Sequence, residues 1–371
     1  MARLGDVATF INGYAFKPED WSSIGLPIIR IQDLTGNSYQ ANRYNGDYAK
    51  KYEVNEGDIL ISWSASLGVY VWHGEKALLN QHIFKVVFDK VEISKSFFVY
   101  QVESILEKAA SAAHGATMKH LTKPVFDALP FYLPPLDEQR KIAAVLDKVS
   151  DLIAKRRQQL DKLDTLVKAR FVEMFGDPVS NSKCWNVESL EDVCDGIGDG
   201  LHGTPEYDDE GEYPFINGNN LINGAIEITP ATKKVNAETY RKHYIGISKN
   251  AILLSINGTL GKLAYYNGEE VVLGKSACYC NLKPGINREF VYGVMKTDAF
   301  TEFLEKKATA STIQNVGLKA IRGYKLIMPP EALQKQYIGF SNQNNKLKLE
   351  VSQSLEKLGM LKKSLMQLYF G

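Results

Sequence analysis

The sequence predicts an α+β protein in which one structural unit is used twice: two tandem α/β domains joined by two long helices that pack as an antiparallel coiled coil. Three observations lead to this prediction. An internal repeat covers half of the chain. Each half begins with short β-rich runs that are separated by turn residues. Each half ends in a stretch whose apolar residues follow the heptad period.

The internal repeat is a tandem duplication rather than a series of short units. Residues 4–7 (Leu-Gly-Asp-Val) return as residues 190–193 (Leu-Glu-Asp-Val), and residues 58–62 return as residues 251–255. Later in each half the matching residues are 195 positions apart. Pairs that show this are Pro134 and Pro329, Gln139 and Gln334, Leu160 and Leu355, Phe175 and Phe370, and Gly176 and Gly371. The two halves therefore carry two copies of one domain and one helix.

The two domains are predicted from β-rich runs that end in Gly, Asn and Asp turn signals. These runs are residues 27–31, 58–62, 83–88, 251–255 and 271–273. Apolar residues at helical spacing follow at 97–113 and 290–304. The predicted boundaries are 1–133 for the first domain, 134–176 for the central helix, 177–328 for the second domain and 329–371 for the C-terminal helix.

A long helix is predicted after each Pro-Pro pair, because proline lacks the backbone donor that the first helical turn leaves free. The first helix is expected over residues 137–175, interrupted in its seam at Arg156 and Arg170. The second is interrupted at Asn344 and Ser354. The predicted seam comprises Ile142, Leu146, Val149, Ile153, Leu160, Leu163, Val167 and Met174 in the first helix, and Phe340, Leu347, Val351, Leu358, Leu361, Leu365 and Leu368 in the second. The simplest arrangement packs the two helices on each other; the alternative packs each helix on its own domain.

The composition is that of an ordinary globular protein. The 371 residues carry 44 Lys and Arg against 43 Asp and Glu, a net charge of +1, so binding of nucleic acid must depend on local clusters of charge. No apolar leader and no run of 18 apolar residues occurs, which predicts a cytoplasmic protein that does not span a membrane. The four cysteines are expected to be free thiols, without structural zinc.

The sequence offers no catalytic centre. Residues 198–203 satisfy the GxGxxG pattern, but Thr204-Pro205 follows where a dinucleotide-binding helix would have to begin. Residues 274–276 (Gly-Lys-Ser) lack the glycine spacing of a phosphate-binding loop. The six histidines show no paired metal spacing. We therefore expect no enzyme activity, no metal site and no cofactor in this chain.

Loops rich in amides, imidazoles and cations occur at corresponding places in the two halves. Residues 12–17 correspond to residues 198–207, and residues 115–120 correspond to residues 310–315. Such side chains read base edges and phosphates; the alternative is that each is a turn residue that serves the backbone. The candidate DNA-binding residues are Tyr14, Lys17, Arg30, Arg43, Lys119 and His120 in the first half, and His202, Tyr207, Lys233, Lys234, Arg241, Lys262 and Lys275 in the second.

The whole chain resembles the DNA-specificity (S) subunit of type I restriction-modification systems. The resemblance rests on residues 199–207 (Asp-Gly-Leu-His-Gly-Thr-Pro-Glu-Tyr), residues 115–122 (Gly-Ala-Thr-Met-Lys-His-Leu-Thr), residues 133–142 and the duplicated layout. The junction of Pro-Pro-x-x-x-Gln with a long helix, which occurs twice, is its strongest part. One departure is that the chain starts directly in the first domain and ends at Phe370-Gly371, which leaves open how completely a pseudo-twofold ring closes.

The resemblance implies a division of labour in a larger complex. Two target-recognition domains each read one half of a split site in double-stranded DNA, while the long helices set their separation and dock two modification (methyltransferase) subunits. S-adenosylmethionine, ATP and Mg would act on partner subunits: the modification subunits methylate adenine, and restriction (endonuclease and translocase) subunits cut DNA. Because the aligned loops differ, as Arg30 differs from Asn217, the target is expected to be asymmetric.

Two other classes of function compete with this interpretation. One is a methyltransferase or nuclease with an undetected site, which explains neither the duplication nor the paired helices. The other is a coiled-coil scaffold with two protein-binding lobes that does not read DNA. Methyltransferase and helicase genes beside this one would favour the recognition subunit.

Overall fold

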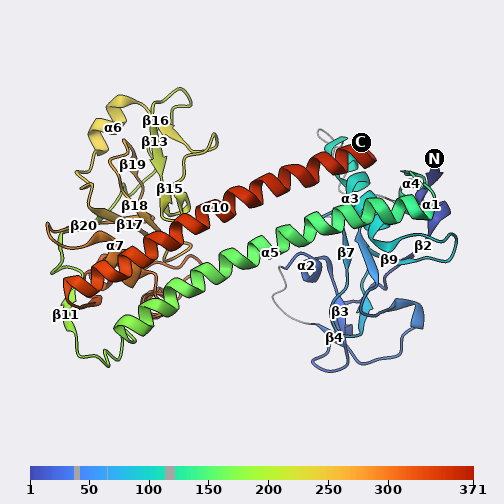
Figure 1. The fold of residues 1–371 in the computed structure, drawn as a ribbon, viewed down its shortest axis with the longest axis horizontal. Helices are drawn as coiled ribbons and strands as arrows, with labels where there is room; N and C mark the ends of the chain where they lie inside the picture. The colour runs from blue at the N-terminus through green and yellow to red at the C-terminus, as the bar shows by residue number, and fades with distance from the viewer. Residues whose placement is uncertain (37–41, 65, 113–121) are drawn as a thin grey trace. The chain divides into compact units, whose positions relative to one another are not determined.

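The structure is a computed structural model that describes residues 1–36, 42–64, 66–112 and 122–371. The chain forms two compact units. Unit 1 comprises Met1–Gln158 and Ser352–Gly371, and unit 2 comprises Gln159–Val351. Both divisions fall inside the long helices α5 (Leu136–Phe175) and α10 (Glu331–Phe370), which Figure 1 shows as continuous ribbons. Each unit therefore holds the start of one long helix and the end of the other.

Unit 1 is built on two sheets. The main sheet has the order β2 (Thr9–Asn12), β9 (Ile83–Val87), β6 (Ile59–Ser62), β7 (Gly68–Val71), and all its pairs are antiparallel. The second sheet has the order β4 (Arg43–Tyr44), β3 (Leu26–Ile29), β8 (Ala77–Leu79), β5 (Glu53–Val54), with β3 and β8 parallel. The other elements are β1 (Ala2–Arg3), paired with β10 (Pro130–Phe131), the helices α1 (Leu4–Val7), α2 (Ile31–Leu34), α3 (Lys95–Ala112) and α4 (Lys123–Asp127), and 3-10 turns at Pro18–Asp20 and Lys50–Tyr52.

Unit 2 repeats this plan. Its main sheet has the order β12 (Cys194–Asp199), β20 (Ala277–Leu282), β17 (Ala251–Ser255), β18 (Leu263–Tyr265). Its second sheet has the order β16 (Lys234–Val235), β13 (Tyr213–Ile216), β19 (Val272–Leu273), with β13 and β19 parallel. The remaining elements are the pairs β11 (Asn186–Ser189) with β21 (Lys325–Met328) and β14 (Leu221–Ile222) with β15 (Ala225–Ile226), the helices α6 (Ala237–His243), α7 (Arg288–Met295), α8 (Asp298–Lys307) and α9 (Leu318–Arg322), and a 3-10 turn at Gly218–Asn220.

The strand registers show that the two main sheets are equivalent where β6 and β17 end, although β12 also has a register shift between Cys194 and Gly196 that β2 lacks. Ser62 ends β6 opposite Ile83, and Ser255 ends β17 opposite Ala277. Each serine hydroxyl donates to a carbonyl four residues later, that of Ser66 or Thr259. The predicted strands therefore occur twice in the same arrangement. Together with the long helices, this confirms the predicted α+β class and the duplication.

The predicted helices near the end of each domain differ between the units. In unit 1 a single helix, α3, covers the apolar run as far as it is described. In unit 2 the corresponding run is divided into α7 and α8. The break falls at Thr297, whose side chain accepts a hydrogen bond from the Phe300 amide and so caps α8. The helical spacing was a correct signal, but it did not reveal this new start.

A buried glutamine explains the spacing of each Pro-Pro junction. The side-chain amides of Gln139 and Gln334 donate to the carbonyls of Pro134 and Pro329, both at 2.8 Å. Gln139 also accepts a hydrogen bond from the Ser94 amide at 3.0 Å. Each glutamine thus satisfies a carbonyl just before a helix begins, where no helical donor reaches it.

The predicted seam of α5 lies on its covered side. Ile142, Leu146 and Val149 are buried, and Ile153, Leu160, Leu163, Val167 and Met174 are half-buried. The alternation of steps of four and three therefore describes the face that α5 turns to its neighbours.

The predicted seam of α10 is wrong at three positions. Leu347, Leu361 and Leu368 are 46%, 46% and 74% exposed. The covered row runs instead through Tyr337, Asn344, Val351, Leu358 and Leu365, with Ser341, Lys348, Leu355, Lys362 and Tyr369 beside it. The row contains lysines because their charged ends reach partners: Lys348 Nζ lies 2.7 Å from Asp164, and Lys362 Nζ lies 3.5 Å from Glu103.

The helices pack on each other in antiparallel directions within unit 2. The side-chain amide of Asn344 donates to the Leu163 carbonyl at 3.1 Å, and the Tyr337 ring meets the Phe171 ring at 5.4 Å. Of these two contacts, the one nearer the C-terminus of α5 is nearer the N-terminus of α10, so the helices run antiparallel. Within unit 1, Ile142 and Leu146 of α5 share one core cluster with Met366 and Phe370 of α10.

Each domain core includes the last residues of a long helix. In unit 2, Phe175 is fully buried, with its ring 5.3 Å from the Phe290 ring. In unit 1, Phe370 lies with its ring 5.5 Å from the Phe97 ring, and its carbonyl accepts a hydrogen bond from Lys108. The two phenylalanines hold equivalent positions in the duplication. Each long helix therefore ends in the core of one unit, and the other long helix begins beside that same core.

The cysteines are free thiols. Cys278 and Cys280 lie two residues apart in β20 and are both fully buried in the unit 2 core. The contact with Cys280, followed by burial, raises the pKa of the Cys194 thiol far above its usual range. The Cys194 thiol therefore stays protonated, and the three buried cysteines pack as small apolar groups.

Replacing Phe370 by Ala is expected to destabilise unit 1, although Phe370 lies at the end of the second repeat. The lost ring contacts should cost about 3 kcal/mol and speed amide hydrogen exchange in α3 and β9, whereas Phe175→Ala should speed exchange in α7 and β20. Leu368→Ala, in the same turn but 74% exposed, is the control and should change neither. Identical exchange patterns for the two phenylalanine variants would contradict this assignment.

Candidate nucleic-acid interface

In unit 2, several loops meet at one end of the main sheet, where β12 and β17 end and β20 and β18 begin. We call this the loop end. The Leu201 amide donates to the Leu273 carbonyl at 2.7 Å, and the Lys275 amide donates back to the Leu201 carbonyl at 3.1 Å. The Ile256 amide donates to the Ser276 carbonyl at 3.0 Å, and the Val316 amide donates to the Ile256 carbonyl at 2.9 Å. Segments far apart in the sequence are therefore joined by backbone hydrogen bonds into one surface.

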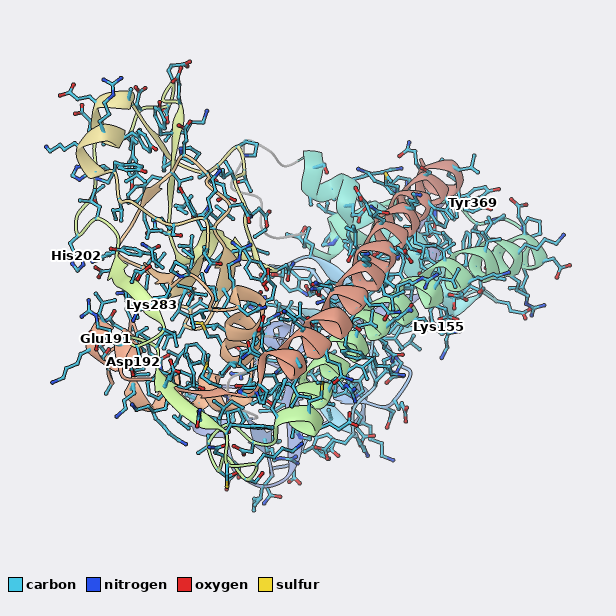
Figure 2. The ribbon with its side chains drawn as sticks, turned by 60° about the vertical axis from the view of Figure 1, so that its left-hand side comes forward. Lys155, Glu191, Asp192, His202, Lys283 and Tyr369 are labelled. Carbon is cyan, nitrogen blue, oxygen red and sulfur yellow. The ribbon has the colours of Figure 1, made fainter. Side chains whose placement is uncertain are left out.

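Polar side chains of the unit 2 loop end are held by one another. His202 Nε2 lies 2.7 Å from Asp199 Oδ2, and the His202 side chain is 71% exposed. The Ser276 hydroxyl donates to Asn217 Oδ1 and accepts from the Gly218 amide, both at 2.9 Å. Figure 2 labels His202 at the loop end, and it labels Asp192 and Lys283 at the opposite end, where β12 begins and β20 ends. There the Lys283 ammonium donates to the Asp192 carbonyl.

Unit 1 has the equivalent loop end, where β2 and β6 end and β9 and β7 begin. The Tyr14 amide donates to the Leu79 carbonyl at 2.9 Å, and the Gln81 amide donates back to the Tyr14 carbonyl at 2.8 Å. The Trp63 indole N–H donates to Asn12 Oδ1 at 3.2 Å, and its ring lies 5.0 Å from the His82 ring. His82 has a φ of 71°, a backbone conformation that residues other than glycine rarely adopt.

A glycine at each loop end lets the chain pass against the neighbouring strand. A Cβ on Gly13 would lie 1.9 Å from the Asn80 carbonyl oxygen, and a Cβ on Gly200 would lie 2.0 Å from the Leu273 carbonyl oxygen. Neither contact is possible for any other residue without movement of the backbone. The two glycines therefore fix the path of the loop that follows each first strand.

The predicted DNA-binding residues divide into two groups by position. Tyr14 in unit 1 and His202, Lys262 and Lys275 in unit 2 lie at the loop ends. Tyr14 is 45% exposed and Lys275 is exposed, whereas Lys262 is half-buried. Lys119 and His120 lie outside the described residues.

The other candidates of unit 1 lie at the second sheet and have partners within the protein. Arg43 donates to the Gly25 carbonyl at 2.8 Å and to Glu75 at 2.7 Å. Arg30 lies 3.9 Å from Asp33 with its guanidinium over the Trp21 ring, and Lys17 lies 3.7 Å from Glu19. These contacts give Arg43 a structural role that the sequence did not indicate.

The other candidates of unit 2 lie beside an acidic loop. Lys233 Nζ lies 6.0 Å from the centre of the Tyr207 ring and 3.9 Å from Asp209. Residues 206–212 carry five carboxylates, and Lys234 and Arg241 are exposed nearby in β16 and α6. Because nearby carboxylates weaken attraction to phosphate, the loop end is the better surface for DNA.

The candidate residues predicted from the sequence do not include five side chains at the loop ends, namely Asn12, Trp63, His82, Asn217 and Ser276. Each is an amide, hydroxyl or aromatic side chain at or directly beside the end of a strand, whereas most predicted candidates are cations. A strand that ends in an amide directly before a glycine, as at Asn12-Gly13, is the signal that could have identified one of them.

The fold and the paired loop ends define a duplicated protein with two structurally equivalent surfaces. The family model described as the type I restriction modification DNA specificity domain matches residues 1–164 and 182–357. The chain belongs to this family, and the two matched regions coincide with the two halves of the duplication.

Individual relatives agree with this membership. The chain is 29% identical over 168 residues to the specificity subunit of type I restriction enzyme EcoBI from Escherichia coli, which is 44% of this chain and 35% of that protein. It is 26% identical over 158 residues to the MjaVIII specificity subunit from Methanocaldococcus jannaschii, which is 39% of this chain and 37% of that protein. The matched segments thus span about a third of the length of these relatives.

A solved structure shares the fold. A chain from the structural study of complex assembly and conformational transition of the type I R-M system matches with a TM-score of 0.54 and 17% identity, over 100% of this chain and 96% of that one. In the four described ranges, no helix has the length and apolar character that crossing a membrane requires. Within the same ranges, no group of His, Cys, Asp or Glu side chains could hold a metal ion.

Replacing Gly200 by Ala is expected to open the unit 2 loop end, because the new Cβ would overlap the Leu273 carbonyl. The hydrogen bonds of the Leu201 and Lys275 amides should weaken, and their hydrogen exchange should become faster. The cost in stability should be about 1 to 3 kcal/mol. Gly196→Ala is the control, because Gly196 lies in β12, which ends directly before Gly200, and nothing lies within 4 Å of its new Cβ. Unchanged protection of both amides in Gly200→Ala would show that the close approach does not hold the loop.

Proposed function

We propose that this chain is the DNA-recognition subunit of a type I restriction-modification complex and that each domain reads one half of a bipartite, asymmetric target. The observation that carries the proposal is one frame built twice with different side chains on its loop ends. Tyr14 in unit 1 stands where Leu201 stands in unit 2, since they form equivalent bridges to Asn80 and Gly274. The repeated backbone places the two loop ends in the same way within their domains. The different side chains on the two loop ends let the domains prefer different bases.

The local electrostatics support reading rather than bulk attraction. With a net charge of +1, the chain has little long-range pull on DNA. The loop ends instead combine few cations with amides, hydroxyls and imidazoles, the groups that hydrogen-bond to base edges. This combination suits a subunit whose partner subunits make many of the contacts to the DNA phosphates.

We propose that the chain acts in the cytoplasm as a non-catalytic subunit, bound to double-stranded DNA, two modification subunits and the restriction subunits. S-adenosylmethionine, ATP and Mg act on those partners. Family membership and the relatives, which are specificity subunits, support this proposal.

The long helices serve as the spacer. Each has 40 residues, about 60 Å at roughly 1.5 Å per residue, and their length sets the unread gap between the half-sites. Their exposed apolar side chains, among them Leu152, Leu166, Leu347 and Leu368, suit the docking of modification subunits. A scaffold that binds two proteins and no DNA remains the competing proposal, and sequence-specific methylation separates the two.

Exchanging residues 1–133 for the equivalent domain of a relative should change one half of the methylated motif. The reason is that each main sheet carries its own loop end, so the readers act independently. Methylation mapping of cells that carry the exchanged chain with its partner subunits measures this. A change in both halves would refute independent reading, and a complex that methylates without any sequence preference would refute the proposed function.

Lys275→Ala should weaken binding of the assembled complex to all DNA sequences alike. If its exposed ammonium contacts a phosphate, the slope of log affinity against log salt should fall by about one. Lys306→Ala is the matched control, because Lys306 is also exposed, on α8, and pairs with Glu302 at 3.4 Å. An unchanged slope in Lys275→Ala would remove Lys275 from the interface.

A further inference from the structure

Asn12 in unit 1 and Asp199 in unit 2 occupy the same position of the duplicated fold. Asn12 is the last residue of β2 and pairs with Phe84, and Asp199 is the last residue of β12 and pairs with Cys278. Phe84 and Cys278 are equivalent, since each directly follows the strand residue that faces the serine ending β6 or β17. The register of the strands, not a similarity of sequence, establishes this pair.

The Asn12 amide is held in one orientation and still has free hydrogen-bonding groups. Its Oδ1 accepts from the Trp63 indole N–H at 3.2 Å, and the Trp63 ring stacks on the Phe84 ring at 5.6 Å. Asn12 is exposed, and Nδ2 has no partner in the described part of the chain. The amide therefore presents one donor and one remaining acceptor lone pair to the outside.

The Asp199 carboxylate is held in a comparable way. Its Oδ2 lies 2.7 Å from His202 Nε2, and its side chain is 22% exposed. No residue among those described bonds to Oδ1. Because an ionised carboxylate can only accept hydrogen bonds, this position presents an acceptor where unit 1 presents both a donor and an acceptor.

Gly13 and Gly200 fix the position of these side chains. Each glycine follows the residue in question and lies against the end of β8 or β19, so closely that a Cβ would meet a carbonyl oxygen at 1.9 or 2.0 Å. The backbone next to each side chain is fixed, and one side-chain oxygen already has a hydrogen-bond partner. Such a side chain loses little conformational entropy when it binds. Such side chains are suited to discriminate between bases.

The two chemistries match different base edges in the major groove. An amide bonds in two places to adenine, accepting from N6 and donating to N7. A carboxylate accepts from the N4 amino group of cytosine, whereas guanine and thymine offer it only acceptor atoms there. Adenine also offers an amino group, N6, but its acceptor N7 lies beside that group and repels the second carboxylate oxygen. A difference of one side-chain atom at one fold position thus separates the preferences of the two units.

We propose that Asn12 and Asp199 are equivalent specificity-determining residues, with Asn12 reading an adenine in one half-site and Asp199 reading a cytosine in the other. This inference rests on the proposed function, because it needs both units to face DNA. It goes beyond it by assigning one base in each half-site to one side chain. Trp63 and His202 are the positioning residues that hold the two readers.

Reciprocal substitution tests the assignment in the full complex. Asn12→Asp should turn the preference at one position of its half-site from adenine to cytosine, by roughly 10- to 100-fold in relative affinity. Asp199→Asn should turn one position of the other half-site from cytosine to adenine by a similar factor. The measurement is binding of the assembled complex to duplexes that carry each of the four bases at each target position, together with methylation mapping in cells.

Asn55→Asp is the matched control. It makes the same chemical change on an exposed asparagine in the turn that precedes β6, at the end of the main sheet away from Asn12. Its motif should equal that of the unchanged chain. Asn12→Ser and thermal unfolding guard against misfolding: a folded Asn12→Ser complex should lose discrimination at the position that Asn12→Asp alters.

The outcomes separate this inference from the proposed function. If the unchanged chain directs methylation to a bipartite motif but Asn12→Asp, folded and active, leaves every base preference as it was, the assignment is wrong and the proposed function stands. Uniform weakening on all sequences would likewise make Asn12 a phosphate contact or a structural residue. If the unchanged chain shows no sequence preference, the proposed function itself fails.

Discussion

The structure depends on the burial of aromatic rings from the helix ends in the domain cores. Phe175 at the end of α5 packs in unit 2, and Phe370 at the end of α10 packs in unit 1. Each helix also begins beside the domain that precedes it, through the buried Gln139 or Gln334. A helix anchored at both ends cannot slide without exposing an aromatic ring, at a cost of several kcal/mol.

The two units use the same frame to hold different surfaces. Strand registers, the strand-end serines and the close-approach glycines recur in both, while the side chains that they place do not. Since the frame fixes the backbone, we propose that a change of one loop-end side chain alters which bases are preferred and leaves the fold intact. This separation allows a chain with almost no net charge to recognise DNA through a few placed groups.

The features predicted from sequence were those that a local pattern determines. The heptad period predicted α5 and its covered face, and the β-rich runs predicted β6, β9 and β17 of the main sheets and β3 and β19 of the second sheets, but not the other strands. The covered face of α10 was not predictable, because Lys348 and Lys362 lie on it only by virtue of carboxylates from distant segments. The structural contacts of Arg43, a predicted DNA-binding residue, were not predictable, because its partner Glu75 is 32 residues away. The equivalence of Asn12 and Asp199 needed the strand register, which no spacing in the sequence specifies.

The central claim is that two copies of one domain read two different half-sites. Base-resolved mapping of adenine methylation, in cells that carry this chain with its modification subunits, tests this claim most directly. The account predicts one motif made of two unlike half-sites separated by a gap of fixed length, which disappears when this gene is deleted. A continuous motif, a motif with two identical half-sites, or a motif that persists after deletion would contradict it.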